Sequence, residues 1–225
     1  MKDVEKIMGL IKGICPEGVF PGNSGDHKVS WRIDPFHVLI STVLSQRTKD
    51  RNTFNASSRL FKEFNTPREI AKAPLETLEE LIRPSGFPKA KAMAIKEISR
   101  RVHEEMGGEV PKTIEELLTL PMVGRKTANC VLSYGFGIDA ICVDTHVHRI
   151  SNRIGLVKTR NPEETEYALK KIVPKHLWID VNSLLVRFGQ TVCQPRNPHC
   201  WDCPICSFCD YYSKIYIKSR TSTHT

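Results

Sequence analysis

The chain has 225 residues, of which 40% are hydrophobic and 26% are charged. This balance is typical of a folded protein of one or two domains and excludes a disordered chain. The 33 basic residues outnumber the 25 acidic ones, which gives a net charge of +8. A basic protein suits a polyanionic partner, although charge by itself says nothing about the fold.

The N-terminal segment predicts an amphipathic helix that is capped by Asp3 and ends at Pro16. Its apolar residues, from Val4 to Ile14, recur at helical spacing. No apolar run here is long enough for a signal peptide or a membrane span. We therefore expect a cytoplasmic protein with no membrane association, in which the eight cysteines are ligands and reduced thiols and not a disulfide framework.

Signals for the start of a helix recur along the rest of the chain. Asp34-Pro35 joins an N-cap to a proline at the first helical position, and the apolar residues that follow predict a buried helix over 34–45. Other caps are followed three residues later by an acid, and these caps are Thr66, Thr113 and Asn161. No stretch alternates over the length of a strand. The sequence therefore predicts an all-α fold.

The segment from Leu120 to Asp144 predicts a tight turn, a helix that opens near Arg125, a glycine-rich break at Gly135 and Gly137, and a second helix start. The turn offers bare backbone amides at the positive end of a helix dipole. Such a turn suits phosphate, most usefully on a polymer that carries a phosphate at every step.

Lys126 lies in the first turn of that helix, where the dipole and partial burial would lower the pKa of its ammonium group. A neutral amine is a nucleophile that forms Schiff bases with carbon centres. Asp144 is a carboxylate that could assist a leaving group, stabilise positive charge or move protons. The pattern also allows a solvated Lys126 and an Asp144 that is only the N-cap of a helix over 144–154.

A cysteine-rich segment near the C-terminus predicts a metal or cluster site, because it gathers Cys193, Cys200, Cys203 and Cys209. Tetrahedral zinc also takes four thiolates, usually as two close pairs with a longer gap between them. The lone first cysteine fits an iron–sulfur pattern better. Cys206 offers an alternative ligand set together with the last three of these cysteines.

With the motifs LPMVGRKTAN and VDTHVHRI, this cysteine segment resembles the endonuclease III family of DNA repair enzymes, the helix-hairpin-helix glycosylases that carry a 4Fe-4S cluster. The resemblance extends from about Asp34 to Cys209. It implies that the cluster is held by the four cysteines named first, with Cys206 left unligated. It also implies two helical lobes: a six-helix barrel with the hairpin at 27–138, and a cluster lobe at 1–26 plus 139–215. The polar composition of the C-terminus predicts a frayed tail at 216–225.

The resemblance further implies a monomer that acts as a bifunctional DNA glycosylase and AP lyase on duplex DNA with an oxidised pyrimidine or an abasic site. Lys126 and Asp144 would lie on opposite walls of a cleft between the lobes. Lys126 would attack the sugar, form a Schiff base and nick the strand by β-elimination. The alternatives are a uracil or thymine mismatch glycosylase of the same family, whose non-cleaving members generally lack this lysine, and a non-catalytic iron–sulfur DNA-binding sensor.

A base-excising enzyme must flip its target base out of the duplex, which leaves a gap to fill. The resemblance matches Gln46 to the glutamine that fills this gap. The loop at 84–89 is a wedge candidate, with Phe87 or Ile82 entering the stack and Lys89 or Lys91 on phosphate. Alternatively, Gln46 is only a polar residue that ends a helix, and Phe87 is a hydrophobic staple under the next helix.

The remaining expected DNA contacts are the hairpin residues Val123, Gly124 and Arg125, and also His146. The resemblance places His146 in the wall of the pocket. The alternative is a helix histidine whose hydrogen bonds are satisfied within the protein. One position departs from the family's Leu-Pro-Gly-Val-Gly, because Met122 replaces the first glycine. A positive φ there would strain methionine by about 1 kcal/mol. We expect instead a conformation open to any side chain, with Gly124 as the residue that approaches phosphate.

Overall fold

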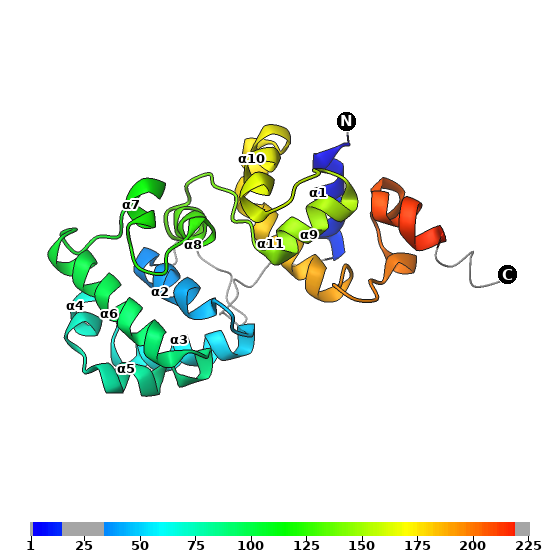
Figure 1. Cartoon of the computed structure of the whole chain (residues 1–225). Helices are drawn as coiled ribbons and strands as arrows, with labels where there is room; N and C mark the ends of the chain where they lie inside the picture. Colours follow the sequence, from blue (N-terminus) through cyan, green and yellow to red (C-terminus); the bar gives the residue numbers. More distant parts are fainter. Residues whose placement is uncertain (1, 15–33, 219–225) are drawn as a thin grey trace. The chain divides into compact units, whose positions relative to one another are not determined.

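The computed structural model describes residues 2–14 and 34–218, and every regular element in these ranges is helical (Figure 1). The prediction of an all-α fold is therefore confirmed. None of the described helices is long and apolar enough to cross a membrane. Of the expected frayed tail, residues 216–218 are helical, and the rest lies outside the described residues, as does Pro16.

The chain divides into two compact units, one from Val19 to Ala140 and one that combines Met1–Gly18 with Ile141–Thr225. The described elements of the Val19–Ala140 unit are α2 (Pro35–Ser45), α3 (Asp50–Glu63), α4 (Pro67–Lys72), α5 (Leu75–Leu81), η1 (Arg83–Ser85), α6 (Pro88–Glu104), α7 (Ile114–Leu118), α8 (Arg125–Cys130) and the π-helical η2 (Val131–Gly135). We call this the hairpin unit.

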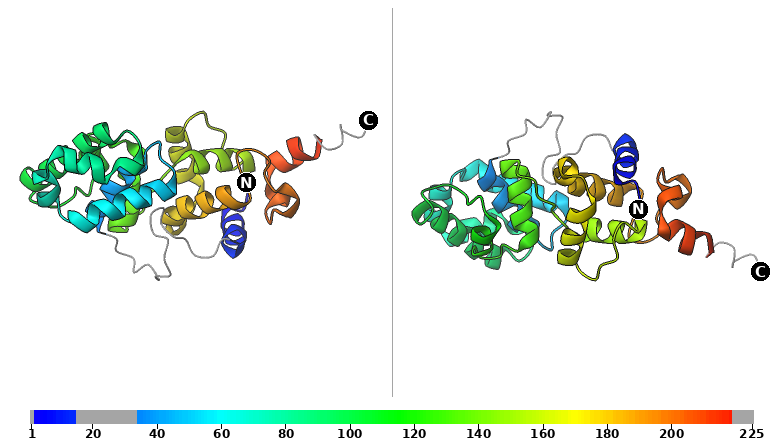
Figure 2. Two further views of the ribbon diagram at one scale, coloured as in Figure 1. Left: turned by 90° about the horizontal axis from the view of Figure 1, so that it is seen from below. Right: turned by 90° about the horizontal axis from the view of Figure 1, so that it is seen from above.

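The second unit contains the cysteine-rich segment, and we call it the cysteine unit. Its described elements are α1 (Val4–Ile14), α9 (Thr145–Ile154), α10 (Pro162–Ile172), η3 (Lys175–Leu177), α11 (Trp178–Thr191), η4 (Cys200–Asp202), η5 (Cys206–Phe208) and the π-helical η6 (Tyr212–Tyr216). Helix α1 packs against α11 although most of the chain separates them (Figure 2). The apolar face of α1 predicted from helical spacing is buried there.

Helix α2 forms the centre of the hairpin unit's core. It packs against α3, α6, α8 and η2, and its residues Val38, Leu39 and Val43 are fully buried. A helix surrounded on several sides needs apolar residues around most of its circumference, which explains its nearly continuous apolar sequence. The predicted burial of helix 34–45 is confirmed.

The predicted helix caps form. The Asp34 carboxylate accepts from the backbone N–H groups of Phe36 and His37, and Thr66 makes a reciprocal capping box with Glu69. Thr113 and Asn161 each accept from the N–H three residues later. Such caps satisfy backbone donors that the helix itself leaves unpaired, and each contributes about 1 kcal/mol.

The glycine-rich break after α8 has a packing cause. At Gly135 a side chain would place its Cβ 2.9 Å from Cα of Pro35, so only glycine allows η2 to lie against the start of α2. Gly137 has a φ of +67°, which glycine adopts at no steric cost. A π-helical turn inside a helix is frequently found next to a functional site.

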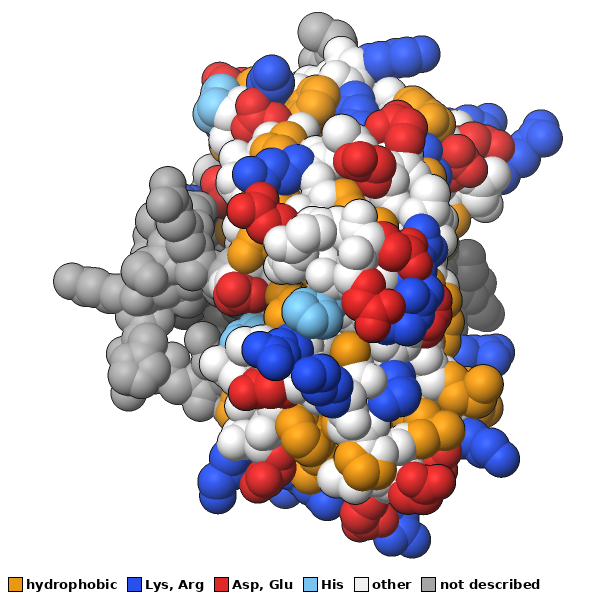
Figure 3. All heavy atoms as spheres, turned by 90° about the vertical axis from the view of Figure 1, so that its left-hand side faces the viewer, with side chains coloured by type: hydrophobic (Ala, Val, Ile, Leu, Met, Phe, Trp, Pro, Cys, Tyr) orange, Lys and Arg blue, Asp and Glu red, His pale blue; other side chains and the backbone are white. Residues whose placement is uncertain are grey.

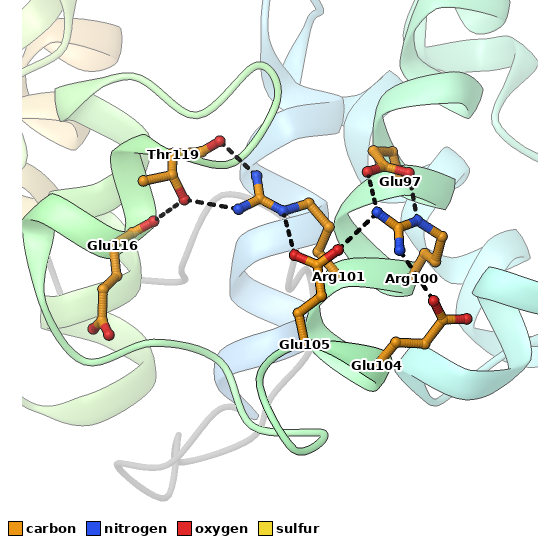
Figure 4. A network of polar contacts seen from close by, with 7 residues as sticks. All are labelled: Glu97, Arg100, Arg101, Glu104, Glu105, Glu116 and Thr119. Atoms are coloured by element: carbon orange, nitrogen blue, oxygen red, sulfur yellow. Dashed lines mark hydrogen bonds and ion pairs between the residues drawn. The ribbon is translucent and has the colours of Figure 1, made fainter.

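An ion-pair network at the end of α6 ties this helix to the residue that precedes the hairpin turn (Figure 4). Arg101 donates to the backbone oxygen of Thr119 at 2.7 Å, and it also pairs with a carboxylate that Arg100 shares. The Arg100 guanidinium pairs with three carboxylates, those of Glu97, Glu104 and Glu105. The network therefore fixes the C-terminal end of α7, where the hairpin turn begins.

The net positive charge does not collect on the face of the hairpin unit that Figure 3 shows, where acidic and basic side chains are interspersed.

The expectation of reduced thiols is wrong for two cysteines, because Cys130 and Cys142 are buried and disulfide-bonded. The five cysteines from Cys193 to Cys209 form no disulfide within the described part of the chain.

Candidate functional site

The hairpin consists of α7, a turn and α8, and its apolar residues anchor it to the core. Val123 is buried, and its backbone N–H donates to the oxygen of Leu120 at 3.2 Å. Its side chain therefore serves the core and is not exposed to a ligand. Gly124 and Met122 are exposed and Arg125 is half-buried, so these three residues form the outward side of the turn.

Lys126 is the second residue of α8 and is half-buried. The four residues that follow it, Thr127 to Cys130, are all buried, and α8 packs against α2 and α7. The Lys126 backbone is therefore held by the core of the hairpin unit. A short, well-packed helix of this kind presents one side chain in a reproducible position, as a nucleophile requires.

The expectation for Met122 is wrong. Its φ is +58°, in the left-handed region, so methionine stands where the family's glycine would be unstrained. The side chain is 39% exposed, and the backbone oxygen accepts a hydrogen bond of 2.7 Å from Nε2 of Gln46. This bond stabilises the strained turn and places Gln46 beside the hairpin.

Glycine at position 124 is not required by the described part of the chain itself. Its φ is −98°, which any residue can adopt, and an added Cβ would meet no atom within 4 Å. The remaining reason for a glycine is a close approach from outside the protein, such as that of a phosphate to the backbone.

The loop before α6 exposes an aromatic side chain. Phe87 is 62% exposed with a φ of +50°, and the Arg47 guanidinium lies 5.9 Å from the centre of its ring. Phe87 is therefore not a staple under α6, and that alternative is wrong. Ile82 and Lys91 are buried, which removes both from the set of DNA contacts, whereas Lys89 is exposed.

In the cysteine unit, Asp144 is the N-cap of α9. Its Oδ1 accepts from the backbone N–H of Val147 at 2.8 Å, and the side chain is half-exposed. The predicted role of Asp144 as the N-cap of a helix is therefore confirmed. It does not exclude a second role, because one carboxylate oxygen is enough for the cap.

His146 packs into the contact between α9 and α11. Its Nδ1 accepts from Nη2 of Arg149 at 3.2 Å, since a guanidinium can only donate. A Cβ at Gly189 would lie 2.4 Å from this nitrogen, so the glycine makes room for the ring. These contacts show a histidine with partners inside its own unit.

The five C-terminal cysteines line one cavity, together with apolar residues of α11 and the ring of Tyr211. Burial, together with a smaller effect of the neighbouring sulfurs, raises the pKa of the Cys200 thiol to about 11 and that of the Cys203 thiol to about 12. Buried thiolates that repel one another need a compensating cation, which an iron–sulfur cluster supplies. Within the described residues, no three His, Cys, Asp or Glu side chains converge as ligands of a single metal ion.

Two arginines of α9 hold the start of the cysteine segment, a feature that the sequence analysis did not predict. Arg153 donates to the backbone oxygens of Gln194 at 2.6 Å and Pro195 at 2.7 Å. Arg149 donates to the oxygen of Cys193 at 3.0 Å, and its burial lowers the pKa of its guanidinium. Their spacing of four residues puts both side chains on one face of α9, and this spacing is the only sequence signal for the pair.

The model of the HhH-GPD superfamily of base excision DNA repair proteins matches residues 40–175. The chain is 55% identical over 205 residues to endonuclease III of Thermotoga maritima, and the alignment covers 90% of this chain and 93% of the relative. The chain belongs to the endonuclease III family. The family expected from the sequence is confirmed, and so is the activity of a DNA glycosylase and AP lyase of base excision repair.

Two of the solved structures that are similar to this chain illustrate the range of the fold. A trapped endonuclease III–DNA covalent intermediate superposes with a TM-score of 0.84 at 33% identity, covering 95% of this chain and 99% of that chain. A thermostable thymine-DNA glycosylase gives a TM-score of 0.76 at 28% identity, covering 93% and 96%. One fold therefore serves more than one base specificity, and the chemistry depends on individual side chains.

Proposed function

We propose that Lys126 is the nucleophile of this family member. Its Nζ attacks C1′ of the damaged nucleotide, the C1′–N bond breaks and the base leaves with the electron pair. The sugar ring then opens to a Schiff base between C1′ and Nζ. This iminium acidifies the proton on C2′, whose removal breaks the C3′–O bond and nicks the strand on the 3′ side. The position of Lys126 on a fixed helix supports the proposal, as does the trapped covalent intermediate of the relative.

Asp144 assists the departure of the base in this proposal. A carboxylate near the sugar stabilises the positive charge that develops as the C1′–N bond breaks, and it can move protons in the steps that follow. The N-cap bond to Val147 fixes the Asp144 side chain, so the carboxylate is oriented before substrate binds.

We propose that the DNA partner is a duplex that carries an oxidised pyrimidine or an abasic site. Gln46 fills the gap left by the flipped base and Phe87 enters the stack, while Lys89, Gly124 and Arg125 meet the phosphate backbone. The exposure of Phe87, Lys89 and Gly124 supports these roles. Val123 contributes by holding the turn, and His146 by lining the pocket.

The proposed lobes, 27–138 for the barrel and 1–26 plus 139–215 for the cluster, follow the family resemblance. We propose that a 4Fe-4S cluster is held in the cysteine unit by Cys193, Cys200, Cys203 and Cys209. When bound, the cluster supplies a rigid framework and takes no part in base removal. Cys206 lines the same cavity and stays unligated. The bonds from Arg149 and Arg153 hold the first ligand's segment against α9.

Borohydride trapping on a duplex with one abasic site tests the nucleophile. The wild-type protein is expected to form a covalent adduct, because borohydride reduces the Schiff base to a stable amine. Lys126→Ala is expected to form none while still binding the duplex. Lys62→Ala, which removes an exposed lysine of α3, is the matched control and keeps full trapping. An adduct with Lys126→Ala at the wild-type rate would assign the nucleophile elsewhere.

A further inference from the structure

Lys91 is a buried cation that the proposed chemistry does not use. It lies in α6 with 1% of its surface exposed. Its Nζ donates to the backbone oxygens of Leu44 at 2.7 Å, Gln46 at 2.8 Å and Ser85 at 2.7 Å, and it lies 2.8 Å from Oγ1 of Thr48. All four partners are neutral oxygens. An ammonium group is the donor-only group that such a set of oxygens requires.

The four oxygens come from the two loops that carry Gln46 and Phe87. Leu44, Gln46 and Thr48 belong to the end of α2 and the turn after it, and Ser85 precedes Gly86 and Phe87. Thr48 links the same loops, because its hydroxyl contacts the backbone oxygens of both Gln46 and Ser85. The Nζ atom of Lys91 therefore holds both loops through hydrogen bonds. Burial lowers its pKa to about 8, which leaves the ammonium as the main form at neutral pH.

Both loops contain a residue in an unfavourable backbone conformation. Arg47 has a φ of +53° and Phe87 a φ of +50°, and neither is a glycine. Such conformations persist only where the surrounding structure fixes them. Lys91 bonds to Gln46 and Thr48, which flank Arg47, and to Ser85, which lies two residues before Phe87.

We propose that Lys91 is a positioning residue that fixes Gln46 and Phe87 in the arrangement needed to fill the gap in duplex DNA and hold the target sugar outside the stack. The inference rests on the proposed function, because it assumes that these two side chains enter the duplex. It predicts a selective defect. Single-stranded abasic DNA has no partner base and no stack to open, so the attack of Lys126 on this substrate does not need the two loops.

The experiment compares borohydride trapping rates on duplex and single-stranded abasic DNA at saturating protein for wild type and Lys91→Met. Methionine keeps an unbranched side chain that is one atom shorter, and it removes all the donors. We expect the duplex rate to fall at least tenfold relative to the single-strand rate. The matched control is Lys96→Met in the same helix, since Lys96 donates to the backbone oxygens of Ala71 and Ala73, away from both loops. This control is expected to keep the wild-type ratio of the two rates.

An equal loss on both substrates would overturn the proposal, because it would mean that Lys91 only stabilises the fold. An unchanged ratio would also overturn it. If Lys91→Met does not fold, Thr48→Val decides, since it keeps the β-branched shape and removes the hydroxyl that contacts Lys91 and Ser85. It is expected to lower the ratio in the same direction, and an unchanged ratio would contradict the proposal. Failure of the wild type to be trapped on either substrate would instead count against the proposed nucleophile.

Discussion

At the scale of single residues, several side chains combine a structural contact with a proposed chemical role. Asp144 caps α9 through one oxygen, and Gln46 holds the strained turn at Met122 through its amide. For such residues a substitution that only deletes the side chain changes two properties at once. The informative variants keep the structural contact and remove the chemistry.

Asp144→Asn is a variant of this kind. Asparagine caps a helix about as well as aspartate, so we expect the melting temperature to change little. The loss of charge is expected to slow release of an oxidised pyrimidine by about 10²-fold or more, in the range of general acid–base effects. Single-turnover glycosylase assays measure this rate. Asp144→Ser, which also caps, should show the same defect, and a normal rate of base release in both variants would leave Asp144 as a cap only.

At the scale of elements, the network at the end of α6 gives a pH-dependent contact. The Arg100 guanidinium holds the pKa of Glu97 below its ordinary value, and Arg101 and Arg100 do the same for Glu105. A carboxyl group whose pKa is lowered in the folded state contributes stability above the ordinary pKa of glutamate, near 4.5. This contribution is lost as the pH falls through the lowered value.

Arg100→Gln should therefore weaken the end of α6 more at neutral pH than at pH 3 to 4. Hydrogen-exchange protection of the peptide that spans residues 88–105 measures the effect, corrected for the intrinsic pH dependence of exchange. Arg68→Gln, in α4, serves as a control for removing an exposed arginine. A difference between variant and wild type that does not shrink on acidification would mean that the ion pairs contribute nothing.

At the scale of the whole molecule, the proposed cluster would couple the cysteine segment to the stability of its unit. Cys209→Ser should lose most of the bound iron and lower the melting temperature, because a serine hydroxyl is a poor ligand for an iron–sulfur cluster. Cys206→Ser is the matched control, since both cysteines are half-buried and line the same cavity. Iron and sulfide analysis of the purified proteins measures the difference. Equal iron loss in both variants would contradict the assigned ligand set.

The features that the sequence predicted well depend on contacts between neighbours in the chain. Caps such as Asp34 and Thr66, the buried helix that became α2 and the start of α9 at Asp144 are fixed by hydrogen bonds and apolar spacing within a few residues. The hairpin motif and the cysteine spacing also act locally, and together they were enough to indicate the family and its activity.

The features that it missed depend on residues far apart in the chain. Lys91 was expected on phosphate, although its spacing with Ile95 and Ile98 already placed it on the buried face of α6. Its partners lie 6 to 47 residues away, and no local pattern shows that four neutral oxygens would meet there. The prediction of an unstrained Met122 failed, because the backbone angle at this position is set by contacts on both sides of the turn.

The sequence by itself therefore determined the helical class and the family, and it supplied the residues proposed for the chemistry, because all of these depend on residue types and short spacings. Only the tertiary structure decided which of those residues are exposed, which are held by a second contact, and which buried cation fixes the loops. Burial and hydrogen bonding between distant segments exist only once the chain has packed, so they cannot be read before the fold is known.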